Sequence, residues 1–345
     1  MSKRQALLLD WVRQRLTGMG LKDGADVTLS QVSGDASFRR YYRVKPGDSS
    51  FIAVDAPPDQ EDSRPFVSVA KLLVDHGLNA PDVFHADFDS GFMLLSDLGD
   101  DLYGAALEDE GSADQLYRDA FHSLLRIQQI DPPRGTVPPY DRQTLLAEMM
   151  LFPDWFVTQQ LGLDLSRAET DLLDTVFDSL IANSLSQPQV LVHRDYHSRN
   201  LLVTESNSPG IVDFQDAVIG AVTYDLVSLL RDCYIAWKPG KVVGWALQYA
   251  ELAQRHGILA DYTKEEFIRW FDLMGLQRHL KVAGIFSRLH LRDGKAIYLK
   301  DIPLVIRYIE QICEKYADLS EMDDWLRRRI IPTMAAKADL FGPLL

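Results

Sequence analysis

The segment Val190–Asp232, VLVHRDYHSRNLLVTESNSPGIVDFQDAVIGAVTYDLVSLLRD, decides the fold expected for this chain. Short apolar runs typical of strands, VLV, LLV and IVDF, alternate in it with polar loops. Asp195 lies in the first loop; Asn200 follows it by five residues and Asp213 by eighteen (213 − 195). We therefore expect the ends of neighbouring strands to present these three side chains together.

These residue types suit phosphoryl transfer, which needs a carboxylate to accept a hydroxyl proton and oxygen ligands to hold Mg²⁺ on the phosphates. Asp195 fits the role of catalytic base, and Asn200 and Asp213 fit that of metal ligands. One amide and one carboxylate suffice, because Mg²⁺ fills its other positions with phosphate and water. The alternative is that all three residues only shape turns, and three matches in order argue against it. The sequence thus predicts an enzyme that uses ATP and Mg²⁺.

The spacing resembles the catalytic loop H-R-D-x-x-x-x-N and the D-F-G metal motif of protein kinases. His197, two residues after Asp195, makes the loop more similar to the aminoglycoside phosphotransferase family, whose loop reads H-x-D-x-H-x-x-N and which includes aminoglycoside, choline and sugar kinases. No long activation segment ending in A-P-E follows Asp213, which argues against a protein substrate. The resemblance implies a bilobal, protein-kinase-like α+β fold with a helix directly after the metal motif.

Three further stretches resemble a narrower group, the bacterial anomeric kinases of N-acetylmuramate and N-acetylglucosamine in cell-wall recycling. They are GDASFRRYYRV at 34–44, VDAPP at 54–58 and VDFQDAVIGAVTYDLVSLLRD at 212–232. The resemblance implies transfer of the γ-phosphate of ATP to the C1 hydroxyl of one of these amino sugars, in peptidoglycan recycling. Which sugar is preferred stays open. So do two alternatives, a kinase for an aminoglycoside or choline-type substrate and a non-catalytic pseudokinase.

The parts of the chain before and after the central segment show different secondary-structure patterns. The first hundred residues predict a helix that ends near Gly18, followed by the order β-β-β-α-β-β, with the internal helix at Arg64–His76. Beyond Asp101 long helical patterns dominate: Asp114–Gln129, Arg142–Leu161, Ser166–Ser184, Glu265–Leu291 and Pro303–Tyr316. We expect an antiparallel-sheet nucleotide lobe at 1–98, a hinge at 96–99, and a mainly helical catalytic and substrate lobe at 99–345.

The nucleotide contacts of the first lobe are expected in a turn at 33–38, between two predicted strands, and at the hinge. The candidates are Gly34, Ser37, Arg40, Asp97 and Leu98. The turn holds a single glycine, so a plain hairpin is an equally good interpretation.

The third strand, FIAVD, departs from the kinase pattern, because it ends in Asp55 and contains no lysine for the phosphates. Another cation must then replace that lysine, and the candidates are Arg39, Arg40, Arg43 and Lys71. In an extended strand Arg40 shares a face with Tyr42, whereas Arg39 and Arg43 lie on the other face.

Two further polar residues of the central segment, His193 and Asp225, are expected to have supporting roles. His193 is expected to brace the loop, and Asp225 is expected either to anchor it or to cap a helix start.

Composition excludes several classes of partner. The 345 residues contain 36 Lys and Arg against 50 Asp and Glu, a net charge of −14 that repels nucleic acid and anionic membranes. Asp10 and Arg13 interrupt the first apolar run, so no signal peptide is expected, and no run has membrane-spanning length. Cys233 and Cys313 are read as buried thiols. We expect a cytoplasmic enzyme with no obligate protein partner.

Overall fold

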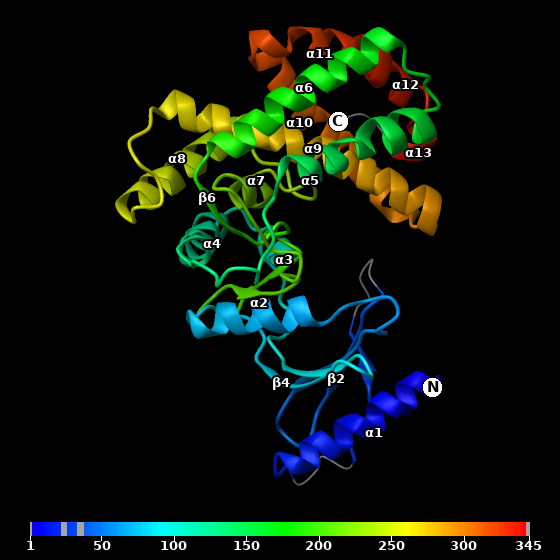
Figure 1. The fold of residues 1–345 in the computed structure, drawn as a ribbon, viewed down its shortest axis with the longest axis vertical. Coiled ribbons are helices and arrows are strands. Elements are labelled where there is room, and N and C mark those ends of the chain that lie inside the picture. The colour runs from blue at the N-terminus through cyan, green and yellow to red at the C-terminus, as the bar shows by residue number, and fades with distance from the viewer. Residues whose placement is uncertain (1, 22–25, 33–37, 343–345) are drawn as a thin grey trace. The chain divides into compact units, whose positions relative to one another are not determined.

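The computed structural model describes residues 2–21, 26–32 and 38–342, which form two compact units (Figure 1). The first unit comprises the chain up to Ile127 together with residues 132–137 and 199–217. The second comprises residues 128–131, 138–198 and those from Val218 onward. An antiparallel sheet in the first and helices in the second confirm the predicted α+β class. The functional division at residue 98 falls inside the first unit and stays a prediction.

The first unit is built on a five-stranded antiparallel sheet in the order β1-β2-β3-β5-β4. Its strands are β1 (Ser30–Gln31), β2 (Arg40–Val44), β3 (Phe51–Asp55), β4 (Val83–Asp87) and β5 (Phe92–Ser96). Helices α1 (Lys3–Gly18) and α2 (Arg64–Asp75) lie on opposite sides of this sheet (Figure 1). Side chains alternate along β2, so Tyr42 packs under α1 while Tyr41 points to the other face.

A distant part of the chain completes the first unit. The short strands β7 (Leu201–Leu202) and β8 (Gly210–Ile211) pair with each other and also bond to the earlier chain. The Val203 N–H donates to the Asp101 carbonyl at 2.7 Å, and the Ile211 N–H donates to the Asn79 carbonyl at 2.8 Å. Helices α3 (Tyr103–Ala106) and α4 (Ala113–Gln128) also belong to this unit, α4 as far as Ile127. Residues 199–217 are thereby fixed to the sheet unit although they follow it by a hundred positions.

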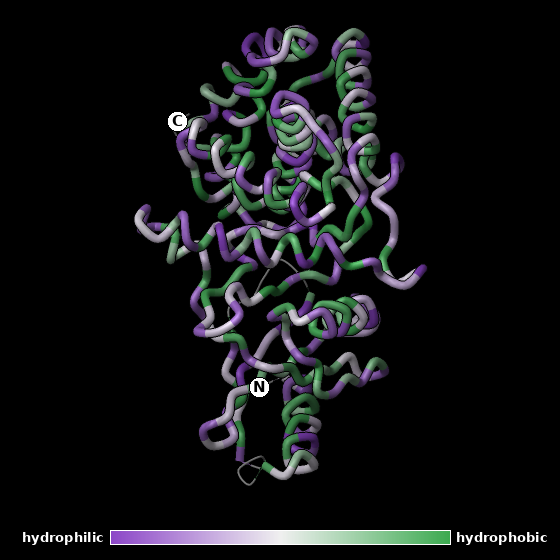
Figure 2. The backbone as a smooth tube through the Cα atoms, turned by 90° about the vertical axis from the view of Figure 1, so that its left-hand side faces the viewer, coloured by the Kyte–Doolittle hydropathy of each residue, from purple (hydrophilic) through white to green (hydrophobic). Residues whose placement is uncertain are grey.

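The second unit is organised around the 30-residue helix α9 (Lys264–Asp293). Residues in the middle of α9 are buried on all sides, as expected for a helix enclosed by others. Helices with extensive contacts to α9 are α5 (Arg142–Met149), α6 (Arg167–Ser186), α7 (Tyr224–Leu230), α8 (Pro239–Arg255) and α10 (Ile302–Lys315). The remaining elements are strands β6 (Gln189–Val192) and β9 (Val218–Ala221) and helices α11 (Ser320–Trp325), α12 (Ile331–Ala335) and α13 (Ala338–Phe341). Hydrophobic and hydrophilic segments alternate along the helices of the chain (Figure 2).

The structure differs from the sequence-based expectations in a few places. The pattern expected as one helix at 142–161 is split, because α5 ends at Met149 and Phe152–Gln160 is π-helical. Pro153 lacks an N–H and cannot continue the α-helical ladder. The expected strand IVDF is cut short after Ile211, and helix α8 was not expected at all. Within the described ranges, no helix is both long and apolar enough to cross a lipid bilayer.

Candidate active site

A cavity of about 210 Å³ in the first unit is enclosed by the sheet, α2 and the β7–β8 pair. Its apolar walls include Tyr41, Ile52, Phe66, Pro81, Leu95, Leu98, Leu102, Leu202 and Val212. Polar side chains in the lining are those of Ser96, Asp97, Arg199, Asn200 and Asp213. The cavity therefore combines an apolar surface suited to a flat base with oxygen ligands suited to a metal ion.

Asp213 and Asn200 lie side by side at this cavity. The Asn200 Nδ2 donates to Asp213 Oδ2 at 3.3 Å, and the Val212 N–H donates to the Asn200 carbonyl at 3.1 Å. Asp213 has a φ of 64°, a left-handed conformation that is uncommon outside glycine and is enriched at functional sites. The Gln215 Nε2 donates to Asp213 Oδ1 at 2.8 Å and holds the carboxylate.

This pair fits a magnesium ion by its donor chemistry. A carboxylate and an amide within hydrogen-bonding distance are hard oxygen donors, and Mg²⁺ commonly takes one or two such protein ligands and completes its octahedron with water and phosphate. Within the described part of the chain, no cluster of three His, Cys, Asp or Glu residues forms a metal site. A site completed by phosphate oxygens is consistent with that composition.

The loop that carries Asp195 belongs to the second unit and is held by hydrogen bonds to Asp225. The carboxylate of Asp225 is fully buried in the first turn of α7 and accepts the N–H groups of His193 at 2.7 Å and Arg194 at 3.0 Å. Burial raises the pKa of Asp225 to about 7, and the two N–H donors act in the opposite direction. Arg194 has a φ of 78°, a conformation that these bonds stabilise. Of the two expected roles for Asp225, the structure favours the anchor.

A second carboxylate, Asp232, holds the far end of the same loop. It accepts the N–H of Ser198 at 3.0 Å and also the Ser198 hydroxyl. Its other oxygen accepts the Tyr234 N–H at 3.0 Å. The loop is braced internally, because the Asp195 N–H donates to His193 Nδ1 at 3.2 Å, as expected for His193. Two buried carboxylates thus fix the backbone on both sides of Asp195.

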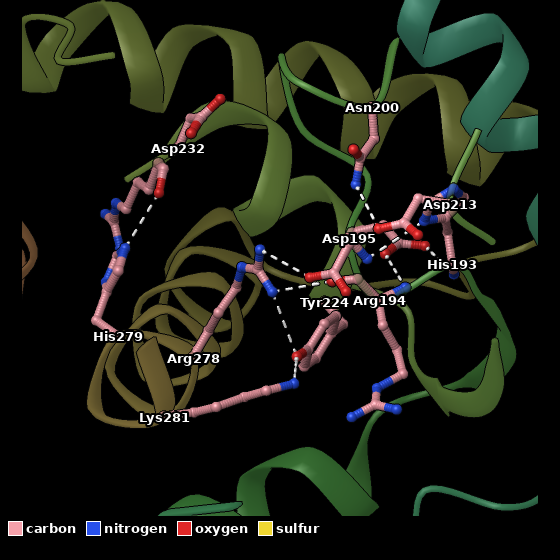
Figure 3. A network of polar contacts seen from close by, with 12 residues as sticks. His193, Arg194, Asp195, Asn200, Asp213, Tyr224, Asp232, Arg278, His279 and Lys281 are labelled. Atoms are coloured by element: carbon pink, nitrogen blue, oxygen red, sulfur yellow. Dashed lines mark hydrogen bonds and ion pairs between the residues drawn. The ribbon is translucent and has the colours of Figure 1, made fainter. Parts of the chain in front are cut away.

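Asp195 faces a cluster of cations on α9 (Figure 3). Its side chain is 39% exposed, and the Arg278 Nη2 lies 3.7 Å from its Oδ1. Burial raises the pKa of Asp195, but the charges of Arg278 and Lys281 outweigh it and leave the pKa well below the ordinary value. Asp195 is therefore ionised at neutral pH and can accept a proton from a bound hydroxyl.

The cations themselves are held by Glu148 and Tyr224. Lys281 Nζ lies 3.1 Å from Glu148 Oε2, and Arg194 forms an ion pair with the other oxygen of Glu148. Lys281 Nζ also donates to the Tyr224 hydroxyl at 3.1 Å. Burial raises the pKa of Glu148, but the charges of Lys281 and Arg194 lower it by more. The carboxylate therefore stays charged. These contacts join α5, α7, α9 and the catalytic loop into one charged network.

The structure places the predicted site residues in different surroundings. Asp97 and Leu98 line the same cavity as Asn200 and Asp213. Arg40 points to the opposite face of β2 from Tyr41 and does not line the cavity. In the sheet, Arg40 stands opposite Asp55 of β3. Gly34 and Ser37 lie outside the described residues. The expectation that Asp195 acts together with the two metal ligands stays a prediction.

Three of the four candidates to replace the missing lysine, Arg39, Arg43 and Lys71, pair with carboxylates. Arg43 binds Asp97, with its Nε 2.5 Å from Oδ2, and also Asp100. Arg39 is buried, lies 3.3 Å from Glu61 and stacks over Phe66. Lys71 is exposed and pairs with Asp75 along α2. Arg4, which was not among the candidates, binds Asp55 at the end of β3 from α1, with its Nε 2.5 Å from Oδ1.

Sequence reasoning missed the residues that surround Asp195. Arg278 and Lys281 come from the middle of α9, and Glu148 comes from α5. A signal was present, because the stretch Gln277–Lys281 places three basic or imidazole side chains inside an otherwise buried helix. Charged groups are rarely buried without a partner, so such a stretch indicates a site.

The chain matches a known protein family and is similar to proteins of known name. The model of the family described as "Phosphotransferase enzyme family" matches residues 28–268. A protein of Pseudomonas aeruginosa named N-acetylmuramate/N-acetylglucosamine kinase is 44% identical over 298 residues, covering 86% of this chain and 87% of its own. A protein of the same name from Neisseria meningitidis is 40% identical over 324 residues, covering 93% and 94%.

Solved structures share the fold at low sequence identity. An ethanolamine kinase of Plasmodium vivax is 12% identical with a TM-score of 0.63, covering 87% of both chains. An ADP-bound aminoglycoside phosphotransferase is 14% identical with a TM-score of 0.57, covering 87% of this chain and 98% of its own. A choline/ethanolamine kinase family protein of Mesorhizobium loti is 14% identical with a TM-score of 0.60, covering 93% and 99%.

Proposed function

The chain belongs to the phosphotransferase enzyme family, and from this premise we propose that it is an N-acetylmuramate/N-acetylglucosamine kinase that takes its phosphate from ATP. The observation that carries the assignment is identity of 44% and 40%, over most of the chain, to two proteins named for that activity. Asp195, Asn200 and Asp213 are proposed to supply the base and the metal ligands that phosphoryl transfer requires.

The nucleotide is proposed to occupy the cavity of the first unit. Tyr41, Ile52 and Leu95 offer an apolar surface to the base, and Asn200 and Asp213 offer oxygen ligands for Mg²⁺ at the phosphates. When bound, Mg²⁺ would neutralise charge that develops on the phosphate oxygens. Gly34, Ser37 and Arg40 stay proposals for further nucleotide contacts.

Asp195 is proposed to accept the proton of the attacking hydroxyl. Its lowered pKa makes it a weak base, which suits a late proton transfer in a loose phosphoryl-transfer transition state. The buried carboxylates Asp225 and Asp232 hold the loop, so that the side chain of Asp195 keeps its orientation without reorganisation.

The electrostatics around Asp195 argue against a cationic acceptor. Arg278 and Lys281 lie beside it, and they would repel the ammonium groups of choline or an aminoglycoside. A pseudokinase is also disfavoured, because Asp195, Asn200 and Asp213 are all present. An uncharged or anionic sugar fits better.

The proposed acceptor atom is the C1 hydroxyl. An anomeric hydroxyl is more acidic than a primary alcohol, so a weak base is better matched to it. A place in peptidoglycan recycling follows from these amino sugars, which are components of the cell wall. A cytoplasmic location is part of the same proposal and agrees with two free, buried cysteines, Cys233 and Cys313.

The position of the phosphate is tested by an assay of reducing ends. A C1 phosphate blocks ring opening, so N-acetylglucosamine that has been fully converted should no longer reduce and should regain reducing power after mild acid. A C6 phosphate would leave the reducing end intact. A product that still reduces after stoichiometric ATP consumption would refute the C1 assignment and leave the kinase assignment standing.

A further inference from the structure

Helix α9 carries a further basic residue, Arg288, beyond the two that lie close to the loop of Asp195. Arg278 lies 3.7 Å from Asp195, and Lys281 lies 3.1 Å from Glu148. Arg288 follows Lys281 by seven residues, which is almost two full turns, so both residues lie on one face of the helix. The rise along the helix places Arg288 about 10 Å beyond Lys281.

Arg288 differs from three other arginines that are buried or partly buried in this unit, because it has no acidic partner among the described residues. Arg194 pairs with Glu148, Arg231 with Asp272 and Arg278 with Asp195. Across residues 2–21, 26–32 and 38–342, no carboxylate lies within ion-pair distance of Arg288, and its Nε is buried without a hydrogen-bond acceptor.

The lowered pKa of Arg288 is consistent with the absence of an acidic partner. Burial lowers its pKa and the charge of Arg292 lowers it further, while Asp293 and Glu148 oppose the change without reversing it. The guanidinium still carries its full charge at neutral pH, because the ordinary pKa of arginine is far higher. A partly buried cation without a counter-ion is costly, and an anionic ligand would remove the cost.

The side chain of Arg288 is expected to lean toward the part of α9 that carries Arg278 and Lys281. In an α-helix the Cα–Cβ bonds tilt toward the N-terminus, so Arg288 leans back toward Lys281 and Glu148. The influence of Glu148 on the Arg288 pKa is consistent with that direction. The side chain of Arg288, when extended, therefore spans part of the distance from its own backbone to a ligand bound beside Asp195.

The two proposed acceptors differ in one group that such an arginine would recognise. N-acetylmuramate carries a lactyl ether with a carboxylate on O3, where N-acetylglucosamine has a hydroxyl. A guanidinium binds a carboxylate through two parallel hydrogen bonds. Building on the proposed function, we propose that Arg288 binds the lactyl carboxylate of N-acetylmuramate and makes the enzyme discriminate between the two sugars.

The test combines a change in the protein with a matching change in the substrate. Arg288→Met removes the charge and keeps most of the length, and the methyl ester of N-acetylmuramate removes the charge from the ligand. In the unmodified enzyme, esterification should raise KM by about tenfold to a hundredfold, as expected for a charged hydrogen bond. In Arg288→Met, KM for N-acetylmuramate should rise by a similar factor, and esterification should then change it by less than about threefold.

Two further variants control for packing and for general charge. Arg292→Met removes a neighbouring exposed arginine that is paired with Asp293, and its KM values should stay within about twofold for both sugars. Arg288→Lys keeps the charge but loses the two-pronged geometry, so it should recover part of the preference for N-acetylmuramate. KM for N-acetylglucosamine should change little in all three variants.

The outcomes separate this inference from the function on which it rests. Equal losses for both sugars in Arg288→Met, or unchanged selectivity, would overturn the role of Arg288 while the kinase activity stands. If the unmodified enzyme phosphorylates neither sugar, the proposed function itself fails and the inference fails with it.

Discussion

The proton affinity of Asp195 is set by side chains far away in the sequence. Arg278 and Lys281 lower its pKa, and neither lies within eighty residues of it (278 − 195 = 83). A carboxylate held in this way is ionised over the whole neutral range, so protonation of Asp195 should not limit activity above pH 5. In the proposed role, Asp195 acts on the chemical step, so its replacement should affect nucleotide binding little.

Asp195→Asn should slow phosphate transfer by about 10² to 10⁴ and leave the KM for ATP within a few-fold of its original value, because a positioned base acts on the chemical step. The measurement is a comparison of kcat and KM at saturating sugar. Glu205→Gln, an exposed carboxylate in the loop between β7 and β8, serves as the control and should behave like the original enzyme. A turnover within a few-fold of the original would remove Asp195 from the role of base.

Asp213→Asn should raise the Mg²⁺ concentration for half-maximal activity by about tenfold or more, because it removes the charge from a proposed ligand. Asn200→Ala should have a smaller effect, since it removes a neutral donor. The titration uses a fixed ATP concentration and varies the metal. An unchanged Mg²⁺ requirement in Asp213→Asn would mean that the ion is held elsewhere.

At the scale of elements, the start of α6 is fixed by a carboxylate with three kinds of partner. Glu169 accepts the Ser166 N–H at 2.8 Å, the Trp325 Nε1–H at 2.8 Å and the Arg329 Nε–H at 3.0 Å. Burial raises its pKa, but these donors outweigh the effect and lower it to about 2. The capping box of α6 therefore also ties this helix to the helices that follow Ser320.

Glu169→Gln should reduce the free energy of unfolding by about 1–2 kcal/mol at pH 7. Because the pKa of Glu169 is lowered in the folded state, its stabilisation is complete above the ordinary pKa and is lost as pH falls toward the folded value of about 2. The difference between the two proteins should thus shrink between pH 5 and pH 3. Urea denaturation across that range measures it, and Glu265→Gln at the exposed start of α9 is the matched control. A difference that does not vary with pH would contradict the assignment.

At the scale of the whole molecule, α9 holds the second unit together through close packing as well as through charge. The backbone of Gly284 lies so near Leu151 that a Cβ would stand 2.3 Å from the Leu151 carbonyl carbon. Gly284 therefore lets α9 approach the junction between α5 and the π-helical segment. That approach also brings Lys281 to Glu148.

Gly284→Ala should destabilise the protein by about 2–4 kcal/mol, because backbone must move to admit the methyl group. Gly244→Ala in α8 is the control, since nothing lies within 4 Å of its Cβ position, and it should stabilise by about 0.5–1 kcal/mol through helix propensity. Thermal unfolding of both variants distinguishes the two signs. A neutral Gly284→Ala would show that α9 packs less closely than the structure indicates.

The sequence by itself predicted most of the elements and the candidate reactive residues. Alternating runs gave the β-β-β-α-β-β order, and the strand–loop spacing singled out Asp195, Asn200 and Asp213. These features lie in short contiguous stretches, where the periodicity of side chains and the preferences of turns are read directly. Local exceptions, such as the π-helical segment after α5 and the left-handed Asp213, were not predicted, because packing overrode the local preference.

Only the tertiary structure decided which charges meet. It brought Arg278 to Asp195, Lys281 to Glu148 and the buried Asp225 to the catalytic loop, and it left Arg288 without an acidic partner among the described residues. No local pattern encodes these pairings, because they join segments tens of residues apart through the packing of α5, α7 and α9. The pKa of a carboxylate depends on burial and on charges within a few ångströms, so the chemical properties of this site exist only once the chain has folded.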